Sequence, residues 1–413
     1  MKKLKLTTKI FIGLIIGIIV GLLMQSIPEI AQSYIKPIGT LFLNMIKMII
    51  VPLVFSSLVV GAASIGDPKA LGRIGGKTVL YYLITTAMAV SIGLVLATIM
   101  NPGAGLEIPV VAAAAAEAAK VPSVLDTLLN IIPSNPLKGL IEGNILQVIT
   151  FALFLGVGST FLPKEKAAPF INFFDSVAEI MYKITTFIMW FAPFGIFGLI
   201  VPVVSQYGID VLKPLSMVIL AVYIGCFLHA ILVYSIAVKY FAKMSPMKFF
   251  KGIAPAAITA FSTCSSSGTL PVTIRSTREN LGVSEKIASF VLPLGATINM
   301  DGTALYQGVC ALFIAQVYGI DLSGVQMVTI ILTATLGSIG TAGVPGAGLI
   351  MLTLVLQSVG LPLEGLILVA GVDRILDMAR TCVNVIGDAS CAVVVNATEN
   401  HIEKSINNLE VSS

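Results

Sequence analysis

The segment from Gly371 to Asp388, GVDRILDMARTCVNVIGD, places acidic and basic side chains in an otherwise apolar part of the chain. At about 100° per residue of an α-helix, its polar residues fall within one stripe roughly 100° wide. The stripe consists of Asp373, Asp377, Arg380, Thr381, Asn384 and Asp388. Charge exposed to lipid is costly, so a polar stripe on a membrane helix faces a bundle interior or a watery cavity. We expect the substrate to lie against this stripe.

The composition of the chain is typical of a polytopic membrane protein. Hydrophobic residues make up 56% of the chain and charged residues 11%, against roughly 25% charged residues in soluble domains. The five cysteines have no CxxC spacing, and we interpret them as small core residues and not as a disulfide framework. With only His229 and His401, the chain offers little for histidine metal chemistry.

Hydropathy predicts six apolar elements before the last third of the chain. They span residues 10–28, 37–64, 78–100, a broken region ending near 162, 170–204 and 212–238. Lysines precede the first span and three basic residues follow the second, so the positive-inside rule predicts a cytoplasmic N-terminus. No small-residue cleavage site follows the first span, so we expect it to be retained and not removed as a signal peptide. Small residues in that span favour close contact with another helix, unless they only reflect the frequency of glycine in membrane helices. These are Gly13, Gly17 and Gly21.

Two later segments have the composition of re-entrant hairpins. Residues 262–271 and 337–348 are dominated by Ser, Gly and Pro. The apolar segment 322–357 has 36 residues, about 18 per arm or roughly 27 Å, which is too short for two full crossings with a loop. Paired interrupted segments predict inverted repeats around a site at the membrane midplane. The alternative is a pair of glycine-rich packing helices.

The span between these segments, about residues 286–318, is interrupted by the sequence Asn-Met-Asp-Gly-Thr at 299–303. Free carbonyls and hard oxygen ligands of this kind suit a small cation. The alternative is a kinked helix with an ion-paired Asp301. We interpret His229, alone in an apolar span, as a hydrogen-bonded packing residue and not as a proton carrier.

Four motifs occur together in the last third of the chain: SSSGTLP at 265–271, NMDGT at 299–303, GTAGVPG at 340–346, and DMART at 377–381 followed by Asn384 and Asp388. With them, nearly the whole chain closely resembles the glutamate transporter family of dicarboxylate and amino acid:cation symporters, especially its archaeal and bacterial sodium:aspartate members. The resemblance implies an all-α polytopic fold with eight transmembrane segments, two re-entrant helical hairpins and inverted repeats. It also implies a homotrimer in contact with membrane lipids, without enzyme activity or nucleic-acid binding.

In that family each protomer has a static scaffold and a transport domain that moves as an elevator, with the second hairpin as its gate. The resemblance places residues 1–73 and 124–207 in the scaffold, and residues 74–100 and 208–400 in the transport domain. Residues 101–123 would form an external loop and 401–413 a cytoplasmic tail. We expect a prokaryotic cytoplasmic (inner) membrane location with both termini in the cytoplasm.

The resemblance also implies the substrate site. Asp377 would bind a substrate ammonium group, and Arg380 would pair with a side-chain carboxylate through two hydrogen bonds. Relatives for neutral amino acids lack the arginine and dicarboxylate carriers lack the aspartate, so the pair favours L-aspartate or L-glutamate. The implied substrate-binding residues are Ser265, Ser266, Thr303, Ala342, Gly343, Val344, Gly348, Asp377, Arg380, Thr381 and Asn384.

Co-transported sodium ions are implied at three groups of ligands. The first is Asp388 with Asn299 and the backbone of Gly295 and Asn384. The second is Asp301 with Asn299, Tyr82, Thr85 and Thr86. The third is the backbone of Thr297, Met300, Ser338, Ile339 and Thr341. The acidic residues between 291 and 395 leave few for a separate proton carrier, which favours sodium. Proton coupling, a C4-dicarboxylate or neutral amino acid carrier, an ion channel and an intramembrane enzyme remain alternatives.

One position departs from the family pattern. Archaeal relatives have an arginine at the position of Cys264, and animal relatives have it at that of Met378. This chain has Arg374 instead, one helical turn before Met378. We hypothesise that Arg374 supplies the same positive field near Asp377 and Arg380 and pairs with Asp373. The alternative is an arginine that anchors or pairs elsewhere.

Overall fold

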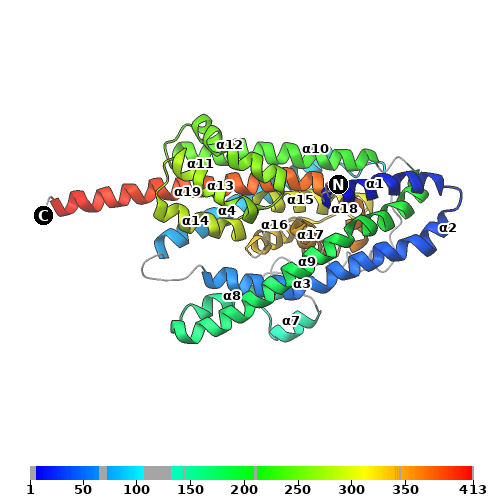
Figure 1. Ribbon diagram of the computed structural model, residues 1–413, viewed down its shortest axis with the longest axis horizontal. Coiled ribbons are helices and arrows are strands. Elements are labelled where there is room, and N and C mark those ends of the chain that lie inside the picture. Colours follow the sequence, from blue (N-terminus) through cyan, green and yellow to red (C-terminus); the bar gives the residue numbers. More distant parts are fainter. Residues whose placement is uncertain are drawn as a thin grey trace, which may run out of the picture.

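The computed structural model describes residues 6–64, 72–106, 132–142, 145–208, 212–339, 341, 343 and 346–411, and the regular structure in these ranges is helical (Figure 1). The first elements are α1 (Leu6–Leu23), α2 (Pro28–Ile30), a π-helix (Ala31–Ile35), α3 (Lys36–Ser64), α4 (Gly72–Met100), α7 (Pro136–Glu142), α8 (Ile145–Ser159) and α9 (Lys164–Tyr207). Then come α10 (Leu212–His229), a second π-helix (Ala230–Tyr234), α11 (Ser235–Tyr240), α12 (Pro246–Thr263), α13 (Ser266–Glu279), α14 (Glu285–Ile298) and α15 (Asp301–Val317). The last elements are α16 (Gly324–Ser338), α17 (Ala347–Ser358), a 3₁₀-helix (Leu363–Gly365), α18 (Leu366–Ala370) and α19 (Asp373–Val411).

One group of helices consists of α1, α3, α8 and α9, in which α9 packs along both α1 and α3 (Figure 1). The glycines of α1 face α9 closely: a Cβ on Gly13 would lie 2.5 Å from Pro193 O, and one on Gly21 would lie 2.6 Å from Val204 Cβ. The predicted close helix contact through these small residues is confirmed, and larger side chains would force α1 away from α9.

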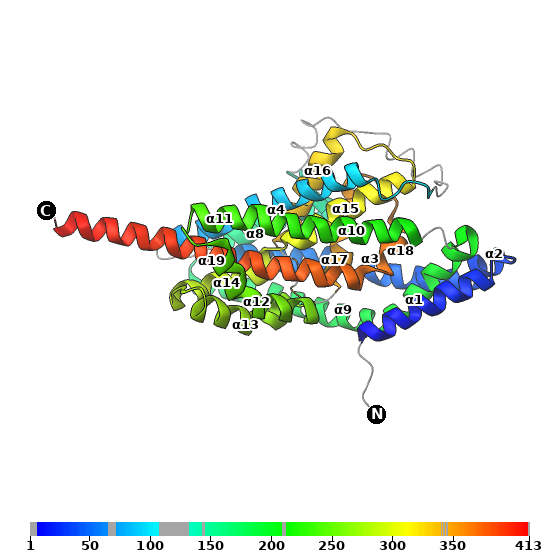
Figure 2. The ribbon, with the colours of Figure 1, turned by 90° about the horizontal axis from the view of Figure 1, so that it is seen from above.

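A second group consists of α4, α10 and the helices from α12 to α19. Helix α4 packs against α10, α15 and α16, and α19 packs against α12, α14 and α15 (Figure 2). The two groups meet where α17 contacts α3 and α8, and where α18 contacts α9. The predicted polar stripe on α19 therefore lies inside the second group, and this burial is what the cost of lipid-exposed charge requires.

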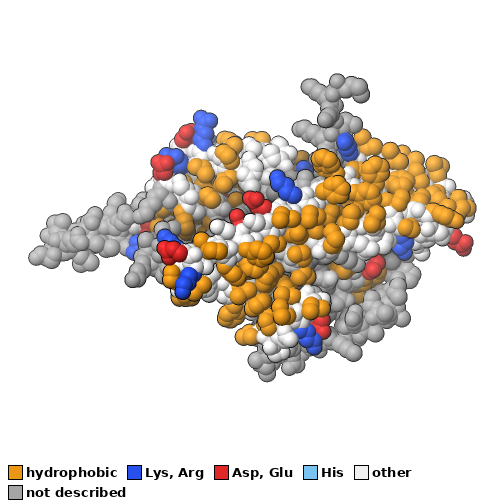
Figure 3. Space-filling view, turned by 60° about the horizontal axis from the view of Figure 1, so that its bottom comes forward, with side chains coloured by type: hydrophobic (Ala, Val, Ile, Leu, Met, Phe, Trp, Pro, Cys, Tyr) orange, Lys and Arg blue, Asp and Glu red, His pale blue; other side chains and the backbone are white. Residues whose placement is uncertain are grey.

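Several helices have the length and composition of membrane spans. Among the described residues, Arg73–Met100, Lys213–Tyr240 and Asp373–Glu399 are long and apolar enough to cross a membrane. Shorter apolar helices, including Gly324–Ser338 and Ala347–Ser358, complete the apolar part of the molecule. Hydrophobic side chains cover a broad part of the face shown in Figure 3, and several charged side chains gather at one end of it.

Each of the two predicted hairpin segments contains a pair of helices that pack together. Helices α12 and α13 pack together and are joined at Cys264, which has a left-handed backbone conformation with φ of 53°. Helices α16 and α17 also pack together. The two tips touch, because Ser267 N and Ser265 Oγ donate to Gly343 O at 3.1 and 2.8 Å. The predicted interruption near Asp301 is confirmed as well, since α14 ends at Ile298 and α15 begins at Asp301.

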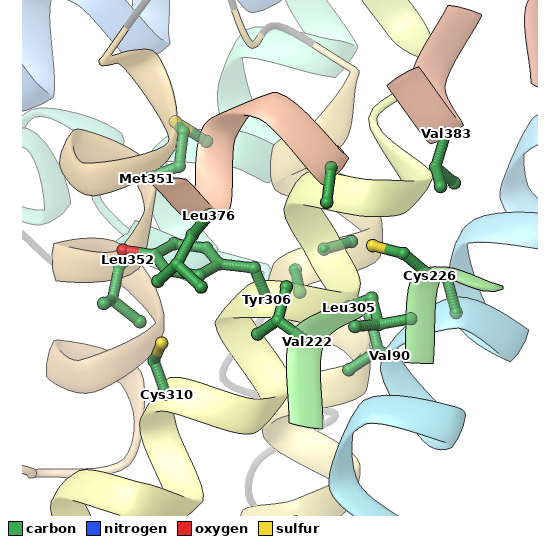
Figure 4. Packing of buried hydrophobic residues seen from close by; sticks show 14 of the residues in the cluster. Val90, Val222, Cys226, Leu305, Tyr306, Cys310, Met351, Leu352, Leu376 and Val383 are labelled. Atoms are coloured by element: carbon green, nitrogen blue, oxygen red, sulfur yellow. The ribbon is translucent and has the colours of Figure 1, made fainter. Parts of the chain in front are cut away.

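The apolar core around these breaks fixes their positions. Helix α15 is buried along almost its whole length. Figure 4 shows part of the core, where Tyr306 of α15, Leu376 of α19 and Leu352 of α17 come together. Such close packing leaves little freedom for the helix ends beside it. The polar tips and the interruption between α14 and α15 therefore meet α19 at one defined place.

Candidate functional site

The candidate site is built where the hairpin tips and the α14–α15 interruption approach α19. Its local structure follows from the sequence: Ser265 caps α13 by accepting a hydrogen bond from Gly268 N at 2.9 Å. Asp301 lies in the first turn of α15, where a carboxylate is favoured by the positive end of the helix dipole. Serine caps and broken helices thus bring polar backbone and side chains into an otherwise apolar interior.

Arg380 is the largest fully buried side chain of the described residues. Its Nη1 donates to Asp373 Oδ1 at 2.7 Å, and its Nη2 lies 3.1 Å from Asp377 Oδ1. The guanidinium also lies over the Tyr306 ring, 4.2 Å from the ring centroid, an arrangement that stabilises a cation. We call Asp373, Asp377 and Arg380 the arginine cluster. Two carboxylates and an aromatic face hold this buried charge in place.

Two nitrogen atoms of the Arg380 guanidinium remain available as hydrogen-bond donors. Within the described part of the chain, Arg380 Nε and Nη2 have no hydrogen-bond acceptor in suitable geometry. On one side the group lies against the backbone of Gly348, where a Cβ would come 2.7 Å from Arg380 Cζ. Glycine at this position therefore leaves room for the guanidinium, and the geometry suits an anionic ligand at the free donors.

Asp377 connects the arginine cluster with the second hairpin. Its Oδ1 accepts from Thr381 Oγ1 at 3.0 Å, and its Oδ2 accepts from Gly346 N at 3.3 Å. Arg374 Nη1 lies 3.7 Å from Asp377 Oδ2. The prediction placed Arg374 near Asp377 and paired it with Asp373. In the structure the ion pair of Arg374 is with Asp377, and Asp373 accepts a hydrogen bond from Arg380. The long Arg380 side chain reaches back two turns, which a stripe on a helix does not reveal.

Asn384 joins α19 to the start of α15. Its Oδ1 accepts from Gly302 N at 2.8 Å, and its Nδ2 lies 3.3 Å from Thr303 Oγ1 and 3.2 Å from Met300 Sδ. The predicted substrate residues Asn384 and Thr303 are therefore neighbours. Ser266 is buried at the first tip, and Gly343 accepts hydrogen bonds from that tip. The predicted residues Ala342 and Val344 lie outside the described residues.

Asp388 and Asn299 form a second buried polar contact, farther along α19 toward its C-terminal end. Asn299 Nδ2 donates to Asp388 Oδ1 at 2.9 Å and to Asn384 O at 3.0 Å. A Cβ on Gly295 would lie 2.5 Å from both Asp388 Oδ1 and Tyr82 Oη. Tyr82, predicted as a ligand beside Asp301, thus has its hydroxyl on the Asp388 side, where it donates to Val291 O at 3.2 Å.

Asp301 accepts hydrogen bonds from two different helices. Thr86 Oγ1 of α4 donates to Oδ1 at 2.6 Å, and Tyr234 Oη donates to Oδ2 at 2.8 Å. His229 Nε2 also lies 3.1 Å from Oδ2. The interpretation of His229 as a hydrogen-bonded residue is confirmed, but its partner Asp301 was not foreseen, and Tyr234 was not predicted at the site at all. A lone histidine in an apolar span was the available signal for this contact.

The remaining predicted residues surround the ends of α14 and α16. Ser338 Oγ lies within hydrogen-bond distance of Ile298 O, at 3.1 Å, and Ile339 and Thr341 are buried beside it. Thr297 Oγ1 donates to Leu294 O at 2.9 Å. Met300 is buried in the same region, and Thr85 Oγ1 donates to Tyr82 O at 3.3 Å. The structure therefore brings helix ends rich in backbone carbonyls near the two buried carboxylates.

The sequence matches a known family along most of its length. The profile of the Sodium:dicarboxylate symporter family covers residues 6–398. A proton/sodium-glutamate symport protein of Geobacillus stearothermophilus is 42% identical over 406 residues, which cover 97% of this chain and 96% of that protein. A proton/glutamate-aspartate symporter of Escherichia coli is 39% identical over 381 residues, or 90% and 87% of the two chains.

A relative named for a different substrate is nearly as similar. A C4-dicarboxylate transport protein of Bacillus subtilis is 36% identical over 384 residues, which cover 92% of this chain and 90% of that protein. The family profile and these full-length similarities agree with the geometry of the buried polar site. The chain is therefore a multi-pass membrane protein that belongs to the sodium:dicarboxylate symporter family, a family of transporters and not of enzymes.

Proposed function

We propose that the protein is a secondary active symporter that imports L-aspartate or L-glutamate together with sodium ions. The observation that supports this most is the buried Arg380, which has donors without acceptors beside Gly348 in the described part of the chain. A planar guanidinium with free donors fits a carboxylate better than a neutral side chain. The relatives named as glutamate and glutamate-aspartate symporters agree with an acidic substrate.

Asp377 is the residue we propose for the substrate ammonium group. It lies 3.1 Å from Arg380 Nη2 and accepts from Gly346 N of the second hairpin at 3.3 Å. An amino acid bound against both groups would present its ammonium to Asp377 and its side-chain carboxylate to Arg380. Thr303 and Asn384, with the backbone of the two tips, would hold the remaining carboxylate. A C4-dicarboxylate has no ammonium group and would leave Asp377 without its ligand.

The case for sodium rests on Asp301 and Asp388, which are both buried. In the described part of the chain, Asp388 has no ion pair with a basic side chain, and His229 is the one basic partner of Asp301. A buried carboxylate without a cation is costly. Asn299 Oδ1, also buried, has no hydrogen-bond donor among the described residues. An alkali cation would satisfy such oxygens, and backbone carbonyls near Thr297, Met300 and Ser338 supply further ligands of the same kind.

Binding of cation and substrate would be coupled through the second hairpin. Cations held at the ends of α14 and α16 would order the backbone that reaches the substrate, so each ligand would raise the affinity for the other. We propose that this hairpin is the gate. We also propose that α1, α3, α8 and α9 belong to a static scaffold in a homotrimer, and that the second helix group moves as an elevator in a prokaryotic cytoplasmic membrane.

Proton coupling is the second candidate, because some relatives are named as proton/sodium symporters and others as proton symporters. Protonation of Asp301 or Asp388 would also remove the cost of a buried charge. It would leave Asn299 Oδ1 without a partner, and for this reason we favour sodium. The two mechanisms differ in which gradient drives uptake.

Uptake into proteoliposomes tests the proposal directly. Labelled L-aspartate, L-glutamate, succinate and L-serine are offered under a sodium, a potassium or a proton gradient. We expect concentrative uptake of the acidic amino acids with sodium, and little uptake of L-serine. Aspartate uptake that needs only a proton gradient would contradict the sodium assignment, and preference for succinate would contradict the role of Asp377.

A further inference from the structure

The carboxylate of Asp301 has two oxygens with different surroundings. Oδ1 accepts from Thr86 on α4 at 2.6 Å. Oδ2 faces Tyr234 Oη at 2.8 Å and His229 Nε2 at 3.1 Å. All four side chains are buried, with His229, Tyr234 and Asp301 at 0% exposure. Oδ1 therefore faces α4, and Oδ2 is held by the last residue of α10 and by the π-helix that follows it.

A local change of helix type brings His229 and Tyr234 to the same oxygen. His229 ends α10, and the π-helix Ala230–Tyr234 follows it directly. In an α-helix, residues five positions apart lie about 140° apart around the axis and could not reach one atom. In a π-helix they are hydrogen-bonded neighbours along the axis. The two rings meet edge to face with centroids 4.8 Å apart. Because π-turns are rare and concentrate at functional sites, this one calls for a reason beyond packing.

The chemistry of the contact defines the direction of both hydrogen bonds. A carboxylate oxygen only accepts, so Tyr234 Oη and His229 Nε2 both donate to Asp301 Oδ2. The histidine hydrogen is therefore on Nε2, and Nδ1 has no hydrogen-bond partner in the described part of the chain. A neutral imidazole suffices for this contact. Tyr234 Oη also lies 3.3 Å from Val383 O of α19, which ties the same hydroxyl to the helix that contains Asp388.

We propose that His229 and Tyr234 are positioning residues for the cation site at Asp301. By holding Oδ2 with two donors, they fix the rotation of the carboxylate and direct Oδ1 toward Thr86, where the cation would bind. This inference rests on the proposed function, because it takes Asp301 as a cation ligand. In this role neither residue would contact the substrate or the cation. Both act through the orientation of one carboxylate, as residues that orient metal ligands do in other sites.

Substitutions at His229 distinguish two properties of the side chain: its ability to donate a hydrogen bond to Asp301 and its ability to take up a proton. His229→Gln places an amide nitrogen the same number of bonds from Cβ as His Nε2, and it donates a hydrogen bond but takes up no proton. His229→Asn places the amide where Nδ1 lies, too short to reach Oδ2. We expect the Asn variant to need roughly tenfold more sodium for half-maximal aspartate binding, because it loses a hydrogen bond to a charged group. The Gln variant is expected to restore a value close to wild type.

Tyr234→Phe tests the second donor with the ring preserved. We expect it also to raise the half-maximal sodium concentration by roughly tenfold, with the affinity for aspartate at saturating sodium little changed. Tyr223→Phe is the matched control. Tyr223 lies on α10, which leads directly into the π-helix, and it donates to Ile375 O of α19 at 2.9 Å. Its half-maximal sodium concentration should stay at the wild-type value.

The measurement is aspartate binding to the purified protein over a range of sodium concentrations, with thermal unfolding of each variant as a check on folding. If aspartate binding to the wild type does not depend on sodium, the proposed function is wrong. If binding does depend on sodium, two results would overturn the positioning inference. One is an equal change of the half-maximal sodium concentration in the His229→Gln and His229→Asn variants. The other is the same half-maximal sodium concentration in the Tyr234→Phe and Tyr223→Phe variants. The inference is supported if the half-maximal sodium concentration stays close to wild type in His229→Gln and, of the two tyrosine variants, rises only in Tyr234→Phe.

Discussion

The arginine cluster and the pair of carboxylates at Asp301 and Asp388 both contain buried charge, but the charge is compensated differently in the two regions. In the arginine cluster, Arg380 lies within 2.7 and 3.1 Å of two carboxylates, so the protein itself compensates much of the charge. Asp388 has only the amide of Asn299 as a described side-chain partner, and Asp301 has hydroxyls and an imidazole. Buried charge needs a partner of opposite sign. We infer that the first region recognises a charged substrate, and that the second leaves its charge to be neutralised by the transported cation.

The largest effect should follow from removing the buried guanidinium. Arg380→Ala leaves Asp373 and Asp377 without their partner and removes the group proposed to bind the side-chain carboxylate. We expect aspartate affinity to fall at least about a hundredfold, since truncating one side of a buried charge pair costs several kcal/mol. Binding of labelled L-aspartate to purified protein measures the effect. The control is Arg275→Ala, an exposed arginine paired with Glu279, and wild-type affinity in Arg380→Ala would refute the substrate site.

Asp388→Asn tests the other region, because it removes a charge while keeping the shape. We expect the sodium concentration for half-maximal aspartate binding to rise by tenfold or more, in line with the loss of a charged ligand. The same substitution at the exposed Asp321 is the control. A sodium response equal to wild type in the Asp388 variant would mean that this carboxylate does not help to bind the cation.

Gly348→Ala tests the fit of the guanidinium in the arginine cluster. The added Cβ would lie 2.7 Å from Arg380 Cζ, and displacing a bidentate donor should weaken aspartate binding by roughly tenfold. The half-maximal sodium concentration should change less than the aspartate affinity. Gly324→Ala is the control, since a Cβ there meets nothing within 4 Å. An unchanged aspartate affinity would show that the guanidinium does not need this space.

The smallest effect is expected for Arg374→Ala. Its Nη1 lies 3.7 Å from Asp377, and its side chain is 17% exposed, so water screens part of the interaction. We expect aspartate affinity and release rate to change by about twofold to fivefold, as for partly exposed charge pairs. Stopped-flow release and equilibrium binding measure both quantities. If neither changes, Arg374 does not supply the positive field near Asp377.

The sequence predicted those features that depend on local composition. Asn-Met-Asp-Gly-Thr indicated the interruption between α14 and α15, and the Ser- and Gly-rich segments indicated the hairpins. The stripe on α19 placed Asp373, Asp377 and Arg380 on one face of the helix. The stripe did not specify which carboxylate accepts the hydrogen bond from Arg380. Asp373 and Asp377 both lie near Arg380 around the helix axis, and the arginine side chain is long enough to reach either.

The part that sequence could not predict depends on a change of helix type. An apolar span of regular α-helix would point His229 and Tyr234 in different directions. The π-turn after His229 brings His229 and Tyr234 to Asp301, and no local sequence motif predicts this turn. The placement of the Tyr82 hydroxyl beside Asp388 likewise depends on how α4 packs against α14, a long-range contact that periodicity does not specify.

The most direct test of the account is the affinity of the wild-type protein for L-aspartate, measured by calorimetry at fixed pH over about two decades of sodium concentration. If cations complete the carboxylate region and order the gate, the apparent Kd should fall steeply as sodium rises, and choline should not replace sodium. An apparent Kd that stays constant across the sodium series, with aspartate still bound tightly, would contradict the coupling between the two regions.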